Sequence, residues 1–525
     1  MTSLSITSLL AALDSTAVST AMPTIDRELG PTFAYVWINN AYILTLTAFQ
    51  PLFGQTSNIF GRRIPIVVAV LLFAVGSAIC GPAPSIAVLI VGRTIQGIGG
   101  AGVTTMVEMV VCDLLPLRER GKFMGFIFSI YGIGIAVGPV IGGVLADRAS
   151  WRWIFYLNLI VAAISAVLLA LSLRVLRTKE TSKNALKRID YSGNTLLVAA
   201  ITSMLLALTW GGSQEPWSSW RTLLPLILGF AGLVGYLLFE TKVPEPTTPL
   251  RLFSNRTSLA GFLLSFTHQT LTFWIIFLFP IYFQAIFQAT PTVSGVDFLP
   301  TAVVSMPFAI ISGAGLSKWG RYRPWHFAGF VLFAISMGLN TMLNENSTRA
   351  FWAGTQIIGA VAIGVLTTIT LPTIQAGLPE SDVAVATATW GFIRGFGNIW
   401  GVAIPSAIFN TRVNSLLGRL DDDNTRRLLS NGGAYALASG TFIPSLDPAQ
   451  RAIVKGIYVN SLKLCWQVAL GFALLGFLIA FIPKEIPLRN ELETEYGFNE
   501  GARQIDEEVA KPLDSEGKKP TDQSV

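Results

Sequence analysis

One carboxylate interrupts the first hydrophobic stretch of the chain. Asp14 lies within "LLAALDSTAVSTAMPTI", a segment otherwise typical of a membrane-spanning helix. At about 1.5 Å per residue it would lie about 16 Å deep, near the middle of a hydrocarbon core about 30 Å thick. Facing lipid there costs a carboxylate about 2.5–3.5 kcal/mol. We therefore expect Asp14 to face a bundle interior or a water-filled cavity and to handle a proton or a substrate; the alternative is a purely structural ion pair.

Four more polar side chains fall at similar depth in other hydrophobic stretches. Arg93 would lie about 10 Å below the outer end of its segment and Asp14 about 13 Å, so the two could pair. Gln96, one turn further along, shares a helix face with Arg93 and could bind substrate or water. His268 and Arg394 are each expected near mid-depth, where His268 either titrates near neutral pH or serves as a helix-to-helix hydrogen-bond partner.

Two other acids are expected to be structural. Glu108 falls near the inner end of its segment, where it can reach water. Asp297 follows "TVSG" and could cap a helix. Neither is predicted to take part in coupling.

The composition predicts a helical protein that crosses the membrane many times. The 525 residues are 52% hydrophobic and only 13% charged, whereas soluble domains carry about 25% charged residues. The cations stand in short connectors, which excludes a nucleic-acid surface. Three scattered cysteines indicate neither a disulfide framework nor a metal site. With two histidines, no paired catalytic acid and no phosphate-binding loop, neither an integral-membrane enzyme nor an ATP-driven pump is expected.

Hydrophobic stretches of membrane-spanning length predict fourteen helices. They fall at about 4–23, 35–55, 64–82, 86–107, 122–146, 153–175, 192–210, 222–240, 258–283, 296–316, 325–343, 350–371, 383–409 and 461–482.

Two pairs of matching motifs indicate an internal repeat. "GQTSNIFGRR" (54–63) and "GAGLSKWGRYR" (313–323) share a Gly–six residues–Gly–Arg spacing after the second span of each half. "YGIGIAVG" (131–138) and "RGFGNIWG" (394–401) match in the fifth spans. Parallel repeats around a midplane site are a transporter architecture. We expect a six-helix bundle over 1–176, a basic linker with two inserted helices over 177–256, a second bundle over 257–483 with a long outer loop at 410–460, and a disordered cytoplasmic tail at 484–525.

The charges of the connectors predict the orientation. Connectors around Arg62, Arg118, Arg188, Arg251 and Lys318 carry most of the cations, which places them and both termini in the cytoplasm. The sequon at Asn346 then falls in an outer loop and is a predicted glycosylation site.

The glycine-rich stretch "GIGIAVGPVIGG" predicts a closely packed helix. Gly134, Gly138 and Gly142 recur every four residues and form a smooth stripe for backbone-close packing, followed by Gly143. Pro139 removes one helix hydrogen bond and introduces a kink. Such a wall could allow rocking while denying ions a leak path, or be a static packing seam.

The inner turn after the second span is a candidate gate. Gly54, Asn58, Gly61, Arg62 and Arg63 place fixed cations at a tight turn, where they can bond the C-terminal carbonyls of a helix. They could hold one conformation closed from inside or only anchor the topology.

Together these motifs resemble the major facilitator superfamily along nearly the whole chain. "LDSTAVSTAMPTI" is similar to the first-helix signature of fourteen-span members, "GQTSNIFGRR" to the loop motif after helix two, "GRTIQGIGGAG" to the helix-four motif and "GPVIGG" to the helix-five antiporter motif. "TWGGSQEPWSSW", "PIYFQAIFQATPTVSGVDFLP" and "PLRLF" resemble the fungal branch of drug:proton antiporters, which includes efflux pumps for toxins.

The resemblance implies roles for these residues. Asp14 and Arg93 would couple protons, with Gln96 in the same helix-four element, and the helix-five glycines would distinguish export from import. One position departs from the pattern: the loop motif usually has Asp where this chain has Asn58, so the charge relay to Arg62 is expected to be weakened.

These features together predict a proton-coupled antiporter that exports lipophilic small molecules by alternating access. Protonation of Asp14, with His268 as a second candidate, would favour one facing state, and Gln96, His268 and Arg394 would line the substrate cavity. The expected partners are substrate, protons and the bilayer; the protein is expected to be a monomer without a cofactor, in the plasma membrane or alternatively the vacuolar membrane. The rival function is a facilitated importer or symporter on the same fold.

Overall fold

The computed structural model describes residues 2–30, 36–172, 186–211, 215–438 and 442–490. Most of the predicted basic linker and the tail beyond residue 490 lie outside the described residues. Residues 484–490 are described, and they pack against the helices.

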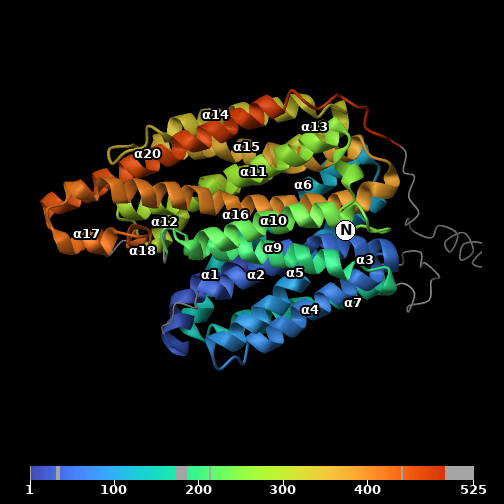
Figure 1. Cartoon of the computed structure of the whole chain (residues 1–525), viewed down its shortest axis with the longest axis horizontal. Helices are drawn as coiled ribbons and strands as arrows, with labels where there is room; N and C mark the ends of the chain where they lie inside the picture. The colour runs from blue at the N-terminus through green and yellow to red at the C-terminus, as the bar shows by residue number, and fades with distance from the viewer. Residues whose placement is uncertain (1, 31–35, 173–185, 212–214, 439–441, 491–525) are drawn as a thin grey trace, which may run out of the picture.

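The fold is all-α and consists of two halves joined by an inserted helix pair (Figure 1). The N-terminal half contains α1 (Thr2–Leu29), α2 (Val36–Ala48), α3 (Gln50–Phe60), α4 (Arg63–Cys80), α5 (Ile86–Leu114), α6 (Leu117–Arg148) and α7 (Arg152–Ser172). The insert contains α9 (Tyr191–Trp210) and α10 (Trp220–Glu240). The C-terminal half contains α11 (Arg256–Ile281), α12 (Pro291–Asp297), α13 (Leu299–Trp319), α14 (Arg323–Asn340), α15 (Arg349–Ala376), α16 (Val383–Leu416) and α20 (Pro448–Ile479).

Twelve helices of the described residues are long and apolar enough to cross a membrane. Two of the fourteen predicted spans are absent from that set, although both form helical segments in the bundle. The second span is divided at Phe49 into α2 and α3, each too short alone, with Pro51 near the start of α3. The eleventh span, α14, includes Arg323, His326 and Asn340, which lower its mean hydropathy.

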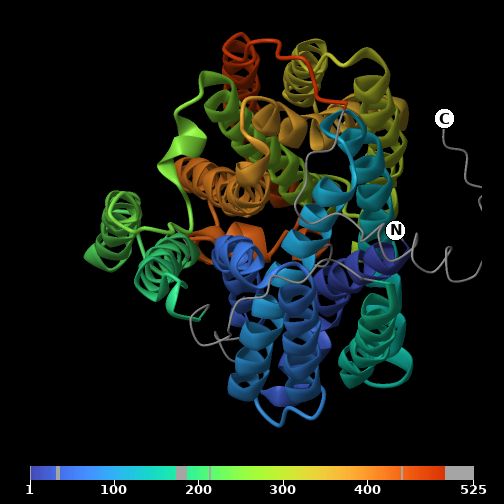
Figure 2. The same cartoon turned by 90° about the vertical axis from the view of Figure 1, so that its right-hand side faces the viewer.

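The two halves stack along one seam, and the inserted pair packs at its flank (Figures 1 and 2). In the end-on view of Figure 2, α9 and α10 stand outside the two bundles on one side. The pair contacts both halves: Asn40 on α2 donates to Thr209 on α9 at 3.2 Å, and the rings of Phe230 on α10 and Trp400 on α16 lie 5.9 Å apart.

The repeated glycine motif occupies equivalent positions in the two halves. Gly61 and Gly320 both end a helix with positive φ, 76° and 67°, a conformation that glycine adopts without steric cost. The first glycine of each motif packs against the other half: a Cβ on Gly54 would collide with Ala388, and one on Gly313 with the backbone of Gly121. This pseudo-symmetry agrees with the predicted repeat.

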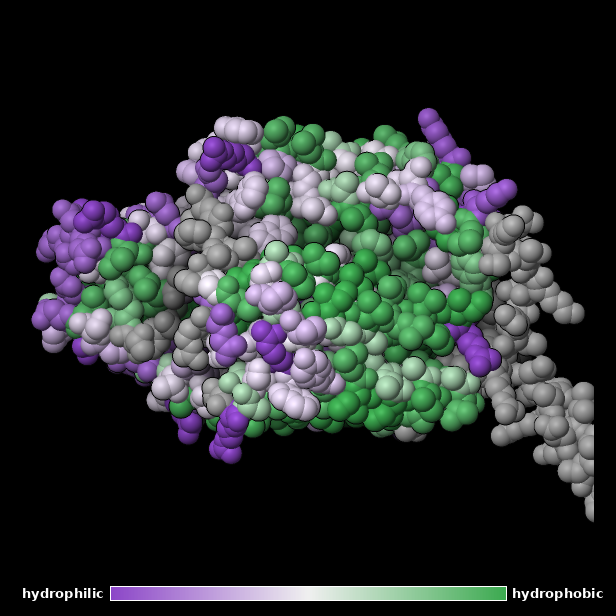
Figure 3. Space-filling model, turned by 90° about the horizontal axis from the view of Figure 1, so that it is seen from below, coloured by the Kyte–Doolittle hydropathy of each residue, from purple (hydrophilic) through white to green (hydrophobic). Residues whose placement is uncertain are grey.

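The surface of the molecule has an apolar band between two polar ends (Figure 3). Large apolar side chains such as Val140, Leu171 and Leu238 are 66%, 71% and 62% exposed on outward helix faces. Side chains of this kind suit hydrocarbon rather than water. We call the end that carries Arg62, Arg118 and Lys318 the basic end, and the opposite end the loop end.

The connection at the loop end is shorter than the predicted 410–460. The helix α16 continues to Leu416 and α20 already begins at Pro448. Between them lie short helices α17 (Asp423–Leu429), α18 (Gly433–Ala436) and α19 (Phe442–Ser445). Both long helices continue past their apolar stretches, because backbone hydrogen bonds sustain a helix beyond the hydrocarbon.

Candidate functional site

Asp14 lies in the interior of the N-terminal half and is completely buried. Its Oδ2 accepts from Nη1 of Arg93 at 2.5 Å, and its Oδ1 accepts from Nε2 of Gln96 at 2.8 Å and from Nδ2 of Asn158 at 2.7 Å. The expected pairing of Asp14 with Arg93 is therefore present, although their role in proton coupling stays a prediction.

Arg93 is also fully buried and is positioned by three helices. Its Nη1 donates to Gln96 Oε1 at 2.8 Å, its Nε donates to the Ile38 carbonyl at 3.3 Å, and its guanidinium stands 4.1 Å from the Tyr42 ring centroid. Its Nη2 has no hydrogen-bond acceptor among the described residues. Charge, hydrogen bonds and the aromatic face together stabilise a cation out of contact with water.

The network contains one acid and one base, so the addition of a proton to Asp14 would break its ion pair with Arg93. In the observed conformation the carboxylate of Asp14 accepts three hydrogen bonds and forms an ion pair with Arg93. A proton on Asp14 would remove the charge that balances Arg93 and would force the guanidinium to find another partner. Helices α1, α4, α5 and α7 all meet here, so this rearrangement would change how they pack.

Asn158 on α7 and Ser77 on α4 belong to the network but were not predicted. Ser77 Oγ accepts from Gln96 Nε2 at 2.9 Å, which fixes the amide orientation of Gln96. The available signal is a single asparagine within the apolar run "IFYLNLIVAA". The hydrogen-bond partner of Asn158 depends on how α7 packs against α1. That packing cannot be predicted from the depth of a residue along one helix.

His268 lies on α11, the first long helix of the C-terminal half, as Asp14 lies on α1, the first helix of the N-terminal half. His268 is 2% exposed, its ring lies 6.1 Å from that of Phe333, and its Nε2 has no partner among the described residues. The first helix of each half thus carries one buried titratable side chain.

Arg394 crosses the seam between the halves. Its Nη1 on α16 donates to Oε1 of Glu108 on α5 at 2.8 Å, and its guanidinium stacks 4.3 Å from the Trp390 ring. Glu108 is 7% exposed and Arg394 24% exposed. Glu108, expected at a helix end that water can reach, is buried and forms an ion pair between the two halves because α16 brings Arg394 against it; its predicted structural part stays a prediction.

The three residues expected to line a substrate cavity do not meet in this conformation. Gln96 is buried inside the first half and His268 inside the second, because both point into their own bundle. Of the three, only Arg394 lies at the seam. Their part in substrate binding stays a prediction.

The glycine stripe of α6 packs directly on α1. A Cβ on Gly134 would lie 2.6 Å from that of Ala12, and a Cβ on Gly138 or Gly142 would collide with α1 as well. Gly143 faces open space, with nothing within 4 Å of a Cβ placed on it. Close packing therefore requires three of the four glycines; Pro139 lies within the same helix.

The inner turn has an acid that the sequence interpretation missed. Arg62 donates from Nε to Asp113 Oδ2 at 2.5 Å, and from Nη1 to Asn58 Oδ1 at 3.1 Å. Asp113, at the end of α5, supplies the carboxylate that position 58 lacks. Arg63 is exposed and donates to the Ala170 carbonyl at 3.3 Å.

Hydrogen bonds between the halves cluster toward the basic end. Arg118 on α6 donates to the carbonyls of Ser317 and Lys318 at 2.7 and 2.9 Å. Arg120 donates to Gln375 at 2.9 Å and pairs with Glu380 at 2.5 Å. The seam is therefore closed at this end.

The segment after α20 reinforces this closure. The amide of Arg118 donates to the Arg489 carbonyl at 3.2 Å, and Arg489 pairs with Glu380 at 3.2 Å. Tyr322 donates its hydroxyl to the Lys484 carbonyl, and burial raises the pKa of Tyr322 to about 12, so this donor stays protonated. The start of the predicted tail thus forms an ordered strap across the basic end.

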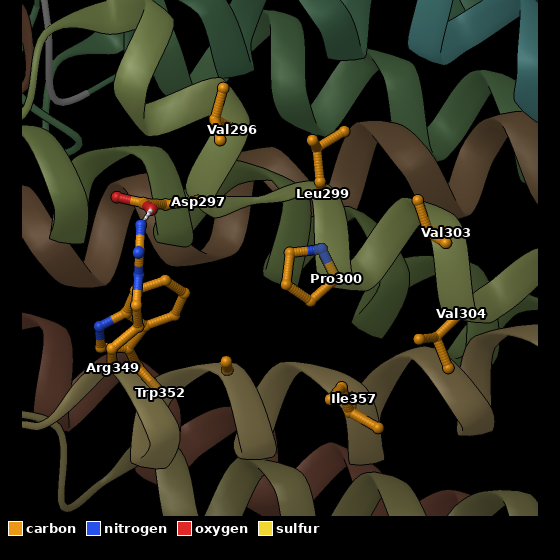
Figure 4. A pocket seen from close by; sticks show the side chains of 10 residues that line it. Val296, Asp297, Leu299, Pro300, Val303, Val304, Arg349, Trp352 and Ile357 are labelled. Atoms are coloured by element: carbon orange, nitrogen blue, oxygen red, sulfur yellow. Dashed lines mark hydrogen bonds and ion pairs between the residues drawn. The ribbon is translucent and has the colours of Figure 1, made fainter.

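A groove of about 440 Å³ opens near the loop end of the C-terminal half, between α12–α13 and α15 (Figure 4). Asp297 and Arg349 form an ion pair of 3.2 Å at one side, and Pro300, Val303 and Ile357 line the rest. Asp297, expected as a helix cap, instead ends α12 and holds Arg349. This groove is distinct from the Asp14 network.

The sequon asparagine Asn346 is exposed in the connection between α14 and α15, at the loop end. That placement is compatible with its predicted glycosylation, which stays a prediction.

Comparisons with known proteins agree with this architecture. A family model described as Major Facilitator Superfamily matches residues 4–402. The MFS-type efflux pump LUC4 of a Fusarium species is 47% identical over 502 residues, which cover 95% of this chain and 89% of the relative. The Acurin A biosynthesis cluster MFS-type transporter of Aspergillus aculeatus is 47% identical over 499 residues, which cover 94% and 90%.

Two solved structures share the fold at low sequence identity. The proton:xylose symporter XylE aligns with a TM-score of 0.58 at 15% identity, covering 94% of this chain and 97% of that one. The human organic anion transporter MFSD10 aligns with a TM-score of 0.58 at 14% identity, covering 91% and 98%. The two-half helical architecture, the repeated glycine motifs and these matches together show that the chain belongs to the Major Facilitator Superfamily.

Proposed function

We propose that this protein exports lipophilic small molecules, of the secondary-metabolite or toxin class, in exchange for protons. The relatives named efflux pumps or cluster transporters support the direction of transport. The buried Asp14–Arg93 pair carries the coupling part, because it is an ion pair that a single proton would break.

The mechanism is alternating access of the two halves. Cytoplasmic connectors carry an excess of Lys and Arg, so we assign the basic end to the cytoplasm. Because the seam is closed at that end, the structure then corresponds to a state closed toward the cytoplasm. A proton reaching Asp14 would release Arg93, loosen the packing of α1 against α5 and α7, and favour opening of the basic end. Substrate binding in the cytoplasm-facing state would displace the proton from Asp14 into the cytoplasm, and the return to the outward-facing state would carry the substrate out.

The seam ion pair between Arg394 and Glu108 is the second element of the mechanism. It links α16 to α5, so it must break when the halves separate at the basic end. A substrate that occupies the seam would compete for Arg394, which is partly exposed and flanked by aromatic rings. His268 offers a second protonatable side chain on the other half.

We further propose that the protein acts as a monomer in the plasma membrane, with the vacuolar membrane as the alternative, and that it uses the proton gradient with no cofactor. Thr2 and the strap at 484–490 lie at the basic end, so both described ends of the chain would face the cytoplasm.

The test is the direction of coupled movement in reconstituted vesicles. Purified protein in liposomes with an acidic lumen should accumulate rhodamine 6G, a lipophilic probe, and alkalinise the lumen faster than protein-free liposomes do. The Asp14→Asn variant should lose both effects. Movement of the probe in the same direction as protons would instead support the symporter alternative and contradict export by antiport.

A further inference from the structure

The inserted helix pair contains two buried acids that the export mechanism does not use. Asp190 caps the start of α9, where its Oδ1 accepts from the Gly193 amide at 2.8 Å. Glu240 ends α10, where its Oε2 accepts from the Thr248 amide at 2.9 Å. They are 7% and 2% exposed, so both carboxylates are largely shielded from water.

The remaining oxygens of these two acids lie close together beside Gly193. A Cβ placed on Gly193 would collide with Asp190 Oδ2 and would lie 2.7 Å from Glu240 Oε1, so the two oxygens are less than about 5 Å apart. Neither oxygen receives a hydrogen bond from a donor among the described residues. Both are buried and aimed into one small space.

Among the residues that the structure describes, no cation forms a salt bridge with either acid. Tyr236 on α10 donates its hydroxyl to Thr248 at 2.8 Å, and Gln55 on α3 is neutral. Arg188 pairs with Glu245 at 2.8 Å and both are partly exposed, and the neighbouring Lys187 and Lys242 are exposed to solvent. Two negative charges at this separation in a buried site repel strongly, whereas one shared proton turns the repulsion into a hydrogen bond.

We propose that Asp190 and Glu240 share one proton and form a second proton-binding site, separate from Asp14, that holds the inserted pair on the N-terminal half. The cluster is attached to α3 by Gln55, whose Nε2 donates to the Glu245 carbonyl at 2.7 Å and whose Oε1 accepts from the Asp190 amide at 3.2 Å. Gln55 directly follows Gly54, which packs against α16 of the other half. Loss of the proton therefore loosens α9 and α10 beside the seam.

The sign and size of the effect follow from proton linkage. The docked state binds one proton more than the released state, so docking weakens as pH rises. At pH values where the docked pair still holds the proton and the released acids do not, the ratio of released to docked protein increases about tenfold per pH unit. This holds whether or not Asp14 couples protons to export.

Hydrogen–deuterium exchange on the full-length protein in detergent tests this proposal. Labelling times are adjusted at each pH so that the intrinsic exchange rate of an unprotected amide is the same. Under these conditions peptides from α9 and α10 of the wild type should become less protected as the pH rises from 5 to 9. Glu240→Gln copies the protonated acid and keeps the acceptor for Thr248, so its α9–α10 protection should no longer depend on pH. Asp190→Asn keeps a capping oxygen and should behave alike. The control Glu245→Gln removes a partly exposed acid from the same region and should follow the wild type.

Three results would overturn the proposal: no pH dependence in the wild type, an unchanged pH dependence in Glu240→Gln and Asp190→Asn, or failure of both variants to fold. The last result counts because each variant carries the uncharged form that the proposal requires for docking. Transport of rhodamine 6G distinguishes this site from Asp14. The Glu240→Gln and Asp190→Asn variants should both still exchange the probe for protons, whereas Asp14→Asn should not.

Discussion

The Asp14→Asn variant tests two properties of the buried ion pair: its contribution to the stability of the fold and its role in proton coupling. The new side chain would keep one oxygen as an acceptor, but its amide would face a donor of Arg93, and the guanidinium would be left buried without a counter-charge. Because both side chains are completely buried, the loss falls in the range for breaking a buried pair, about 3–5 kcal/mol. That is about two to four powers of ten in the unfolding equilibrium.

A double variant removes the orphaned charge. Asp14→Asn combined with Arg93→Gln leaves neutral groups that can hydrogen-bond to Gln96 and Asn158. We expect the double variant to regain most of the stability lost by Asp14→Asn alone, with a coupling energy of about 3 kcal/mol or more in the double-mutant cycle. Neither variant should move rhodamine 6G in response to a pH gradient, because neither has an ionisable acid at position 14.

Stability would be measured by thermal unfolding in detergent, and transport in vesicles that contain equal amounts of folded protein. The wild type and the two single variants complete the cycle. If the folded double variant exported the probe with the same pH dependence as the wild type, the assignment of Asp14 would be refuted. If Asp14→Asn were as stable as the wild type, the inference of an uncompensated buried cation would be wrong.

The remaining predictions concern the helix packing and the gate. Gly142→Ala should cost about 1–3 kcal/mol because its Cβ would press on the α1 backbone, whereas Gly143→Ala should unfold like the wild type in the same thermal assay. Arg394→Ala should increase the labelling of cysteines placed in the basic-end seam by a membrane-impermeant reagent; unchanged labelling would show that its ion pair does not hold the halves together. Asp113→Asn should lower the unfolding temperature more than Asn58→Ala does, because Asp113 carries the charge that balances Arg62; the reverse order would contradict the structure.

The sequence predicted the features that depend on position along a single helix. Depth counted at a constant rise per residue placed Asp14 and Arg93 at one level, and the structure joins them. The repeated Gly–six residues–Gly–Arg spacing predicted two related halves, and Gly61 and Gly320 indeed end equivalent helices.

The sequence did not predict contacts that depend on how different helices pack. Glu108 and Arg394 were each assigned a depth, but their pairing requires α16 to cross α5 at the seam. Asp113 replaces the acid missing at position 58 from another helix, so no local motif reveals it. The start of the charged tail was expected to be disordered because its composition resembles a solvated linker, yet Arg489 is held by partners on the helices.

The central claim is that a proton on Asp14 shifts the balance between the two facing states. Spin labels on cysteines at Pro84 and Glu345, exposed loop-end positions of the two halves, would report their separation by electron–electron distance measurement. The native cysteines are buried and should not react. We predict that the wild-type distance distribution changes between pH 5 and pH 8 and that the Asp14→Asn, Arg93→Gln double variant shows one unchanging distribution. A double variant that still shifts with pH as the wild type does would contradict the account.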